Sequence, residues 1–280
     1  MAVLDVSCAV QGGYVPHSAA MLHSVYAAGE GHEVRVHYLH GPELRRASRR
    51  RLETLADRAG GSIRFWEIAD ERVAGLRVHG YFTSAMWYRI LLPELLADTE
   101  RVLYLDVDTL ALAPLAPLWD VDLDGMLVGA VTNVFEAWRG TEHTDALGLA
   151  QRDYFNSGVL LLNLDQMRRS DTIAELRRVA AERADALLWP DQDVLNLVLG
   201  PRRVVLHPRW NAMNSVLLFD NAADVFGAAQ VEEARRDPAI RHFEGPGVNK
   251  PWERGSQIPH RDDYRAHRRA TPWRWPWVSA

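Results

Sequence analysis

The sequence predicts an α/β fold in which helices cover both faces of a mostly parallel, twisted sheet. Short segments of β-like composition alternate with longer segments of helical periodicity, an order that is typical of strand–helix–strand units. The 280 residues, 48% of them hydrophobic, are enough to form the core of one large domain. We therefore expect a single α/β domain over residues 1–258, followed by a tail over residues 259–280.

Each predicted strand is a short run of β-branched, aromatic or aliphatic residues. The segment 33–39 alternates polar and apolar residues, whereas the segment 155–164 contains the run VLLL and suits a strand that is buried on both faces. Ligands bind beyond the carboxyl ends of the strands in such sheets. The predicted strands, in chain order, are residues 2–10, 33–39, 62–68, 101–105, 126–132, 155–164 and 202–208.

Each predicted helix has apolar residues at helical spacing, and some have signals at their ends. Pro42 opens one helix, as proline often does in a first turn, and Gly60 and Gly61 close it. The helix over residues 83–96 is mostly apolar, so Arg89 within it needs an anionic partner. The predicted helices, in chain order, are residues 18–28, 42–60, 83–96, 165–185 and 191–200.

The overall composition excludes several classes of protein. The 32 Lys and Arg residues against 37 Asp and Glu residues give a formal net charge of −5, which argues against a nucleic-acid partner. The single cysteine, Cys8, cannot form an intrachain disulfide and fits a reducing compartment. Because the sequence has neither an apolar run of about 18 residues nor a signal-peptide pattern, we expect a cytoplasmic protein.

The tail differs in composition from the rest of the chain. Its arginines are interspersed with Trp273, Trp275 and Trp277, a combination that suits contact with an anionic membrane surface. The protein would then lie peripherally at the inner face of the membrane. Packing of these tryptophans onto the domain is the alternative.

Two aspartates, Asp106 and Asp108, directly follow the buried strand RVLYL. A carboxylate at the edge of a core is costly unless a metal, a helix N-terminus, an arginine or solvent binds it. The one-residue spacing allows both carboxylates to share a hard cation with a phosphate. A structural role is the alternative, because Asp-x-Asp occurs four times. One copy, DVDLDG at 120–125, is no EF-hand, since Val131 stands where that loop needs glutamate.

A second candidate site is the loop HFEGPGVNKPW (242–252). Its glycines allow the backbone to approach an anion closely, and Lys250 adds a positive charge. Lys250 is the only lysine in the chain, and it lies in the same glycine-rich loop as His242. This coincidence weakens the alternative that both residues are ordinary surface residues.

Two pairs of polar residues stand at the starts of predicted elements. Asn156 and Ser157 open a buried strand, while Asp191 and Gln192 open a helix, where Asp191 could equally be an N-cap. The sequence contains no GxSxG, Walker A, GxGxxG, HExxH or zinc-binding motif. The carboxylates, His242 and Lys250 are therefore the main candidates for chemistry.

The blocks RVLYLDVDTL, LAPLWD, YFNSGVLLLNL, DQDVLN and HFEGPGVNKPW occur in the order seen in glycosyltransferase family 8, and the chain resembles that family over about residues 2–255. The resemblance implies the GT-A nucleotide-sugar-binding fold. It also implies a retaining, metal-dependent transfer of a hexose, glucose or galactose, from a UDP-sugar to a hydroxyl group. Similar enzymes include bacterial lipopolysaccharide galactosyl- and glucosyltransferases and glycogenin.

The resemblance also implies roles for particular residues. Asp106, Asp108 and His242 would hold Mn²⁺, with Mg²⁺ as the alternative. Asp191, Gln192 and Lys250 would be the catalytic residues, and Tyr14 would stack on uracil. The other donor-binding residues would be Ala9, Gln11, Arg89, Val107, Asn133, Asn156, Ser157, Gly245 and Gly247, together with the two metal-binding aspartates and Lys250.

Three departures from the family pattern concern the donor. Gln11 and Gly12 stand where aspartate is common, and Asn133 stands where an acidic residue is usual beside the sugar. The segment between Gly245 and Lys250 has two extra residues. These departures leave open how uracil is recognised, which hexose is bound and which glycine contacts phosphate.

The acceptor is open as well and could be a glycan, a lipid-linked sugar or a small molecule with a hydroxyl group. A self-glucosylating primer enzyme of the glycogenin kind and a catalytically silent nucleotide-sugar-binding homologue are alternative functions. The sequence is also compatible with a homo-oligomer.

Overall fold

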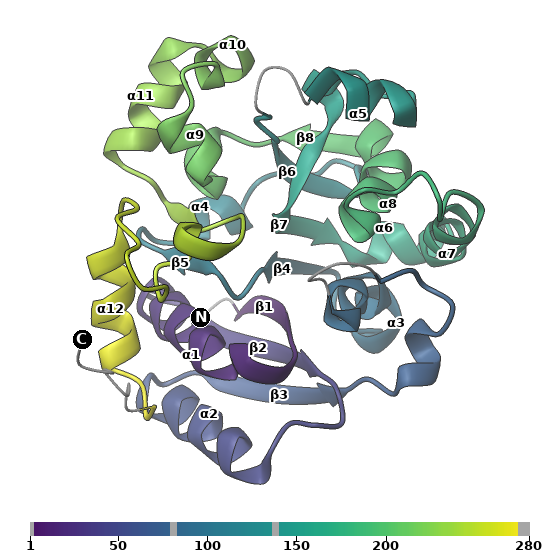
Figure 1. Cartoon of the computed structure of the whole chain (residues 1–280). Helices are drawn as coiled ribbons and strands as arrows, with labels where there is room; N and C mark the ends of the chain where they lie inside the picture. The colour runs from purple at the N-terminus through teal and green to yellow at the C-terminus, as the bar shows by residue number, and fades with distance from the viewer. Residues whose placement is uncertain (1–2, 79–82, 136–139, 274–280) are drawn as a thin grey trace.

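The computed structural model describes residues 3–78, 83–135 and 140–273. Within these residues, a seven-stranded sheet has the order β3-β2-β1-β4-β7-β6-β8, and a second, small sheet pairs β5 with β9. Helices cover both faces of the larger sheet (Figure 1). The predicted α/β class, with a mostly parallel sheet between helices, is confirmed.

The seven strands of the large sheet lie where the sequence predicts them, with shifts of a few residues at their ends. The two strands of the small sheet were not predicted, because three residues are too few to produce a period-two pattern. The strands are β1 Val3–Val10, β2 Glu33–His40, β3 Ser62–Glu67, β4 Arg101–Leu105, β5 Thr109–Ala111, β6 Val128–Thr132, β7 Phe155–Asn163, β8 Arg203–Val205 and β9 Ile240–His242.

Strand β7 runs against its two neighbours, β4 and β6, whereas the other neighbouring strands of the large sheet are parallel. In the β4–β7 ladder Leu105 pairs with Val159 and Arg101 pairs with Asn163. The beginning of β7 therefore lies beside the end of β4. Residues that precede Val159 reach the same edge of the sheet as residues that follow Leu105.

The helices surround the sheet, and short 3-10 segments connect several of them. Two of these segments, η3 Ser84–Leu91 and η6 Pro208–Asn211, contribute to the site described below. The α-helices are α1 Val15–Ala27, α2 Arg46–Arg58, α3 Leu92–Leu95, α4 Ala116–Trp119, α5 Gly140–Leu147, α6 Leu164–Arg169, α7 Thr172–Glu182, α8 Pro190–Leu199, α9 Asn214–Leu218, α10 Ala222–Phe226, α11 Ala228–Arg236 and α12 Arg261–Arg269.

The helix predicted over residues 42–60 begins four residues later, at Arg46. Arg45 before it is extended, with φ −67° and ψ 139°. The segment before Arg45 is used elsewhere: the carboxylate of Glu43 accepts a hydrogen bond of 3.2 Å from the N–H of Gly12 in the first loop. A tertiary contact thus overrides the helix-start signal of the local sequence.

Two other predicted helices are each divided in two. The helix predicted over residues 83–96 is the 3-10 segment η3 followed by α3, because Pro93 has no N–H to donate to the carbonyl of Arg89 in a continuous α-helix. The helix predicted over residues 165–185 is α6 followed by α7. Asp171 stands between them with a left-handed φ of 47°, which breaks the helical path.

The core consists mainly of two layers, one on each face of the large sheet. Strand β4 contributes to both by simple alternation. Leu103 and Leu105 pack in the layer under α1 and α2, while Val102 and Tyr104 pack in the layer under η3, α6 and α8. Because β4 is anchored on both faces, the residues that follow it leave the sheet from a fixed point.

Part of the predicted tail is folded onto the N-terminal helix. Figure 1 shows α12 beside α1, and the Nδ1 atoms of His23 and His267 lie 2.8 Å apart between these helices. Trp273 is 9% exposed and belongs to the core layer of α1 and α2, so for this residue the packing alternative holds. Trp275 and Trp277 lie outside the described residues. Among the residues that are described, no helix combines the length and apolar character needed to cross a bilayer.

Candidate active site

The ends of three short segments bring the predicted metal ligands together. Asp106 follows β4, and its N–H donates a 2.8 Å hydrogen bond to the carbonyl of Gly158 in β7. Thr109 pairs with His242 across the β5–β9 ladder, which places His242 beside Asp108. One ligand atom from each of Asp106, Asp108 and His242 lies within 4.8 Å of the other two.

This donor set fits a hard divalent cation. Two carboxylate oxygens and one imidazole nitrogen suit Mn²⁺ better than Mg²⁺, which prefers oxygen ligands alone. Nε2 of His242 lies 3.4 Å from Oδ1 of Asp108, so both atoms face the same point. The Asp106 side chain is 25% exposed, which leaves this side of the group open to a ligand.

Lys250 and His242 both lie beside Asp108. Nζ of Lys250 contacts its Oδ2 and also donates a 2.9 Å hydrogen bond to the carbonyl of Phe243. Burial by itself raises the pKa of Asp108, but Lys250 and His242 together hold that pKa well below its ordinary value. Burial lowers the pKa of Lys250 and of His242, yet Asp108 raises both above their ordinary values. The Asp108 carboxylate is therefore ionised at neutral pH and available as a ligand.

Arg89, on η3, has the anionic partners that its burial requires. It is 5% exposed, its Nη2 donates a 2.9 Å hydrogen bond to Oδ1 of Asp106, and the same nitrogen lies 3.4 Å from Oδ2 of Asp191. Its Nη1 donates to the carbonyl of Ser157 at 2.5 Å, and its guanidinium stacks 4.3 Å from the centre of the Tyr104 ring. Burial by itself lowers the pKa of Arg89. Asp106 and Tyr104 outweigh this effect and hold the pKa above its ordinary value, so the guanidinium stays charged.

The first turn of α8 places a second acidic group beside Arg89. Trp189 is the N-cap residue of this helix, so Asp191 lies inside the first turn and is not the N-cap. Burial raises the pKa of Asp191 to about 6. Arg89 opposes this shift and Asp106 adds to it. Asp191 therefore changes its charge much closer to neutrality than an ordinary aspartate does.

Gln192 is held at both ends of its amide. Its Oε1 accepts a 2.9 Å hydrogen bond from the N–H of Ser157 and lies 3.3 Å from Nδ2 of Asn156. Its Nε2 donates to the hydroxyl of Tyr154 at 3.1 Å. The same Nδ2 of Asn156 lies 3.4 Å from Oδ1 of Asn133. The structure thus brings together four predicted sugar-binding residues, from β7, from α8 and from the segment that follows β6.

The residues predicted to bind uracil lie at and after the end of β1. Oε1 of Gln11 accepts a 3.2 Å hydrogen bond from the hydroxyl of Ser84. Tyr14 is 42% exposed, and its ring meets that of Trp252 edge-on at 6.0 Å between centres. Ala9 is partly exposed as well, as is Val107 between the two metal-binding aspartates. These side chains remain accessible to a ligand.

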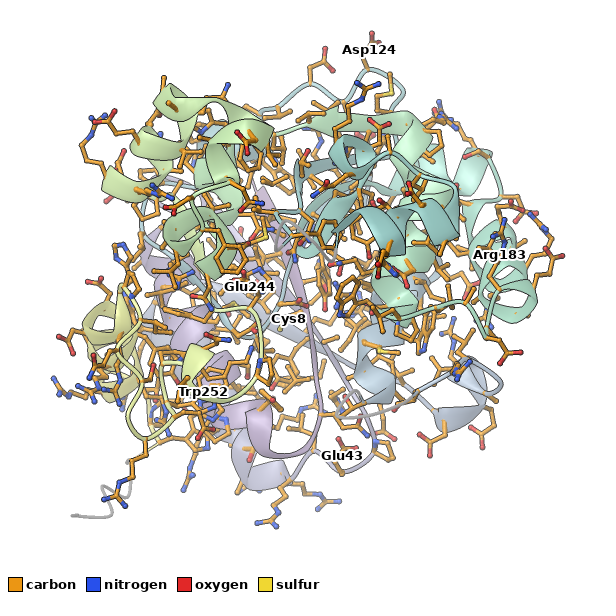
Figure 2. All side chains as sticks on the ribbon, turned by 45° about the horizontal axis from the view of Figure 1, so that its top comes forward. Cys8, Glu43, Asp124, Arg183, Glu244 and Trp252 are labelled. Atoms are coloured by element: carbon orange, nitrogen blue, oxygen red, sulfur yellow. The ribbon has the colours of Figure 1, made fainter. Side chains whose placement is uncertain are left out.

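Two glycines shape the loop that carries Lys250. Gly245 and Gly247 both have left-handed backbone, with φ of 85° and 63°, which favours glycine at these positions. The N–H of Lys250 donates a 2.9 Å hydrogen bond to the carbonyl of Gly247, so residues 247–250 form a tight turn that ends at the lysine. Figure 2 labels Glu244 and Trp252 near the two ends of this loop.

Several residues around the site were not predicted. A Cβ added at Gly158 would lie 2.2 Å from Cε1 of His242, so the missing side chain makes room for the imidazole. A glycine inside a strand is the signal that could have revealed this close approach. Asn211 hydrogen-bonds to His242 from 31 positions away, and Tyr154 bridges Gln192 to Asp193. No local sequence pattern predicts these long-range contacts.

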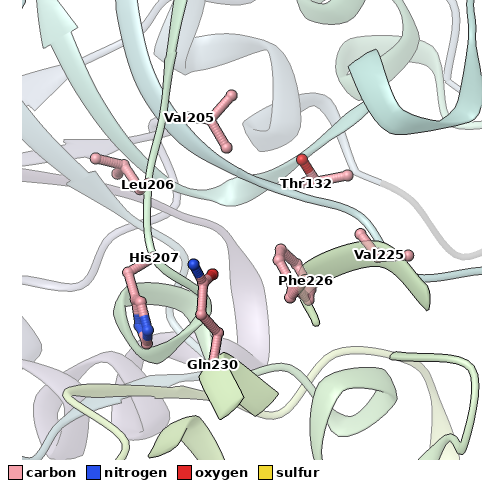
Figure 3. Close-up of a pocket in the computed structure, with 7 residues that line it drawn as sticks. All are labelled: Thr132, Val205, Leu206, His207, Val225, Phe226 and Gln230. Atoms are coloured by element: carbon pink, nitrogen blue, oxygen red, sulfur yellow. The ribbon is translucent and has the colours of Figure 1, made fainter. Parts of the chain in front are cut away.

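A separate hollow of about 420 Å³ lies near the ends of β6 and β8 and beside α10 and α11 (Figure 3). None of the predicted site residues lines it, although Asn133 directly follows one of its residues. The lining residues are Thr132, Val205, Leu206, His207, Val225, Phe226 and Gln230.

Comparison with known proteins places this geometry in a family. Residues 5–255 match the family described as Glycosyl transferase family 8. General stress protein A of Bacillus subtilis (strain 168) is 31% identical over 276 residues, which are 96% of this chain and 93% of that protein. Lipopolysaccharide glucosyltransferase WaaO of Escherichia coli (strain K12) is 25% identical over 234 residues, which are 81% of this chain and 66% of that protein.

The crystal structure of galactosyltransferase LgtC in complex with donor and acceptor sugar analogs matches with a TM-score of 0.86 and 28% identity, and the match covers 98% of both chains. The mostly parallel sheet between helices is the GT-A fold of that enzyme, as the resemblance implied. The chain therefore belongs to glycosyltransferase family 8 and is a glycosyltransferase.

Proposed function

We propose that this glycosyltransferase moves a hexose, glucose or galactose, from a UDP-sugar to a hydroxyl acceptor with retention of configuration and with Mn²⁺ as its metal. The observation that carries the proposal is the convergence of Asp106, Asp108 and His242 beside Lys250. The two hexoses are suggested by the names of the relatives, a glucosyltransferase and a galactosyltransferase. A glycan, a lipid-linked sugar or a small molecule would supply the hydroxyl group.

The cationic groups of the site would stabilise the leaving diphosphate. Asp106, Asp108 and His242 would hold the metal, which supplies Lewis-acid neutralisation of the diphosphate oxygens when it is bound. Negative charge on the leaving oxygen grows as the glycosidic bond breaks. The Lys250 ammonium, next to Asp108, would therefore interact more strongly with the transition state than with the bound donor.

The surroundings of Gln192 favour attack from the same face as the leaving group. Double displacement needs a nucleophile on the opposite face of the sugar. The carbonyl oxygen of Gln192 already accepts the N–H of Ser157, and an amide oxygen is a poor nucleophile. The Asp193 side chain is fully buried and accepts a 2.5 Å hydrogen bond from Tyr154.

In the proposed reaction the bond between the anomeric carbon and the diphosphate oxygen breaks while the acceptor oxygen bonds to the same face of that carbon. The departing diphosphate oxygen takes the acceptor's proton, so atoms and charge balance without a further base. Gln192 and Asp191 would orient the sugar and support the positive charge that develops on its ring.

Asp108→Asn should lower the rate of UDP release about 10²–10³-fold, because a neutral amide replaces a carboxylate ligand of the metal. The measurement is UDP release from UDP-glucose, UDP-galactose and UDP-N-acetylglucosamine, with Mn²⁺ or EDTA and with or without an acceptor. Proton NMR of the product gives the anomeric configuration, which should be α from an α-linked donor.

Asp122→Asn is the matched control, because Asp122 belongs to another Asp-x-Asp pair and is exposed just before the turn at residues 124–125. It should leave UDP release unchanged. Full turnover in excess EDTA would contradict the metal assignment, and a β-linked product would contradict retention. A mass gain on the protein itself would instead indicate self-glucosylation, and binding of UDP-sugar without any UDP release would indicate a silent homologue.

We also propose that the C-terminal region contacts an anionic membrane surface. The guanidinium of Arg51 lies 5.7 Å from the centre of the Trp273 ring, so the described end of the chain adjoins the arginine-rich helix α2. Arg46 and Arg50 are exposed on that helix. Full-length protein should sediment with vesicles that contain phosphatidylserine more strongly than residues 1–273 do, because the shorter form keeps α12 but loses the last two tryptophans. Equal binding of the two forms would remove this proposal.

A further inference from the structure

Asn211, the last residue of η6, stands between the two halves of the site. Its side chain is fully buried. One end of its amide faces Nδ1 of His242 at 3.0 Å, and the other faces Oδ1 of Asn156 at 2.9 Å. Asn156 in turn contacts Gln192. A chain of side chains thus connects the predicted metal ligand with the predicted sugar-binding amide.

The orientation of the Asn156 amide is fixed by a backbone group. The N–H of Gly158 lies 3.0 Å from one end of that amide and can only donate a hydrogen bond, so this end must be the oxygen. A second, independent contact identifies the atom at the other end of the Asn156 amide. The N–H of Ser157 makes the facing atom of Gln192 an oxygen, and Asn156 therefore presents its NH₂ group to Gln192. Both constraints give the same orientation.

The orientation of Asn211 follows from that of Asn156. Because Asn156 presents its oxygen, Asn211 must present its NH₂ group there, and its own oxygen then faces His242. An oxygen at 3.0 Å can only accept, so Nδ1 of His242 carries a proton. In the neutral ring Nε2 is then unprotonated, and Nε2 is the nitrogen that faces Asp108.

We propose that Asn211 is a positioning residue that sets the tautomer of His242, through the backbone-anchored amide of Asn156, so that Nε2 is free to bind the metal. The inference rests on the proposed metal site. The other ring nitrogen of a metal-binding histidine usually donates to a carboxylate, a carbonyl or water, and here a side-chain amide has that role. Gly158 holds the ring in place, because its missing Cβ is what allows Cε1 of His242 to approach.

The same chain links the metal to the sugar. Asn156 donates to Gln192 with one end of its amide and accepts from Asn211 with the other. If Asn211 loses its oxygen, His242 loses the acceptor that selects its tautomer. If Asn211 keeps an oxygen but loses its NH₂ group, the link to Asn156 is lost while the acceptor for His242 remains. Asn211→Ala and Asn211→Asp separate these two functions.

The first test needs no substitution at Asn211. Long-range ¹H–¹⁵N NMR of metal-free protein, at a pH where the His242 ring is neutral, should show a protonated Nδ1 and an unprotonated Nε2. Comparison with His242→Gln identifies the resonances. A protonated Nε2 would overturn the proposal, whether or not the protein binds Mn²⁺.

The second test measures Mn²⁺ affinity by electron paramagnetic resonance of the free ion. Asn211→Ala should bind Mn²⁺ about 10–100-fold more weakly than wild type, whereas Asn211→Asp should stay within a few fold of wild type, because its carboxylate still accepts from Nδ1. Wild-type affinity in Asn211→Ala, or an equal loss in both variants, would overturn the proposal. Failure of the wild type to bind Mn²⁺ would instead contradict the proposed metal, and the NMR result would still decide the tautomer.

Asn163→Ala is the matched control for a general loss of stability. Asn163 lies at the opposite end of β7 and accepts a 3.0 Å hydrogen bond from the N–H of Gln166 at the start of α6. Its loss should lower the melting temperature, as the loss of an N-cap does, and leave Mn²⁺ affinity unchanged.

Discussion

Asp191 and Asp193 lie two residues apart at the start of α8, and both are buried, yet their surroundings differ completely. Asp193 accepts hydrogen bonds from Tyr154, from His143 and from two backbone N–H groups, at 2.5–3.0 Å. Oδ2 of Asp191 accepts no hydrogen bond from the residues the structure describes, and its cationic neighbour Arg89 is 3.4 Å away.

The contrast separates a carboxylate whose oxygens are used by the fold from one that keeps an oxygen without a hydrogen bond from the described residues. A buried carboxylate whose lone pairs are all used by the protein can only stabilise the fold. A buried carboxylate with an oxygen that accepts no hydrogen bond costs free energy in folding, and that oxygen is free to bind a ligand. Both residues are aspartates in the first turn of the same helix, so only their hydrogen-bond partners distinguish them.

The largest effect should come from Asp193→Ala. The substitution leaves the Tyr154 hydroxyl and two backbone N–H groups without acceptors, and we expect the free energy of unfolding to fall by about 3–5 kcal/mol. Urea denaturation followed by circular dichroism measures the change. Asp191→Ala is the matched control and should cost much less. Similar losses in both variants would mean that the two carboxylates do not differ as described.

Asp191→Asn should change how stability depends on pH. Burial raises the pKa of Asp191 from 3.8 to about 6 in the folded protein, so its stabilising contribution is complete below pH 3.8 and is lost as the pH rises through 6. Relative to Asp191→Asn, the wild type should therefore lose about 2 kcal/mol between pH 4 and pH 7.5. Urea denaturation of both proteins at the two pH values tests this. Parallel pH profiles would contradict the raised pKa.

The smallest effect should come from Tyr154→Phe, which removes the link between Asp193 and Gln192. The hydroxyl donates to one and accepts from the other, so we expect a loss of about 1–2 kcal/mol in stability and a decrease in kcat with little change in KM for the donor. Steady-state kinetics and urea denaturation measure the two effects. An unchanged kcat would mean that Ser157 and Asn156 are enough to position Gln192.

The sequence predicts where the strands of this fold lie along the chain better than it predicts whether neighbouring strands are parallel or antiparallel. Apolar runs such as that of β7 reveal a buried strand, but the same run fits a parallel or an antiparallel neighbour, so the reversal of β7 has no local signal. Helix starts were predicted less well. Pro42 carries a start signal, yet the helix begins at Arg46, because Glu43 contacts the first loop instead.

The candidate site could be predicted where its residues stand at the ends of strands or in a distinctive loop. Asp106, Asp108, His242 and Lys250 are such residues, and the structure brings them together. Asn211 could not be found in this way, because its partners lie 31 and 55 positions away and a single buried asparagine has no pattern. Hydrogen-bond partners are a property of the folded chain, whereas spacing is a property of the sequence.

The two-residue period of side chains along β7 makes the site sensitive to changes in chain length. Asn156 and Gly158 point to the same face of the strand, one toward Asn211 and the other toward the ring of His242. An insertion of one residue between Gly158 and Val159 would turn Asn156 and Gly158 to the opposite face, while the apolar pairing with β4 stays in register. The contacts of Asn156 and Gly158 therefore depend on their spacing from the apolar run. Loops grafted or shortened in this enzyme should be cut before Phe155, the first residue of β7, which pairs with Thr132 of β6.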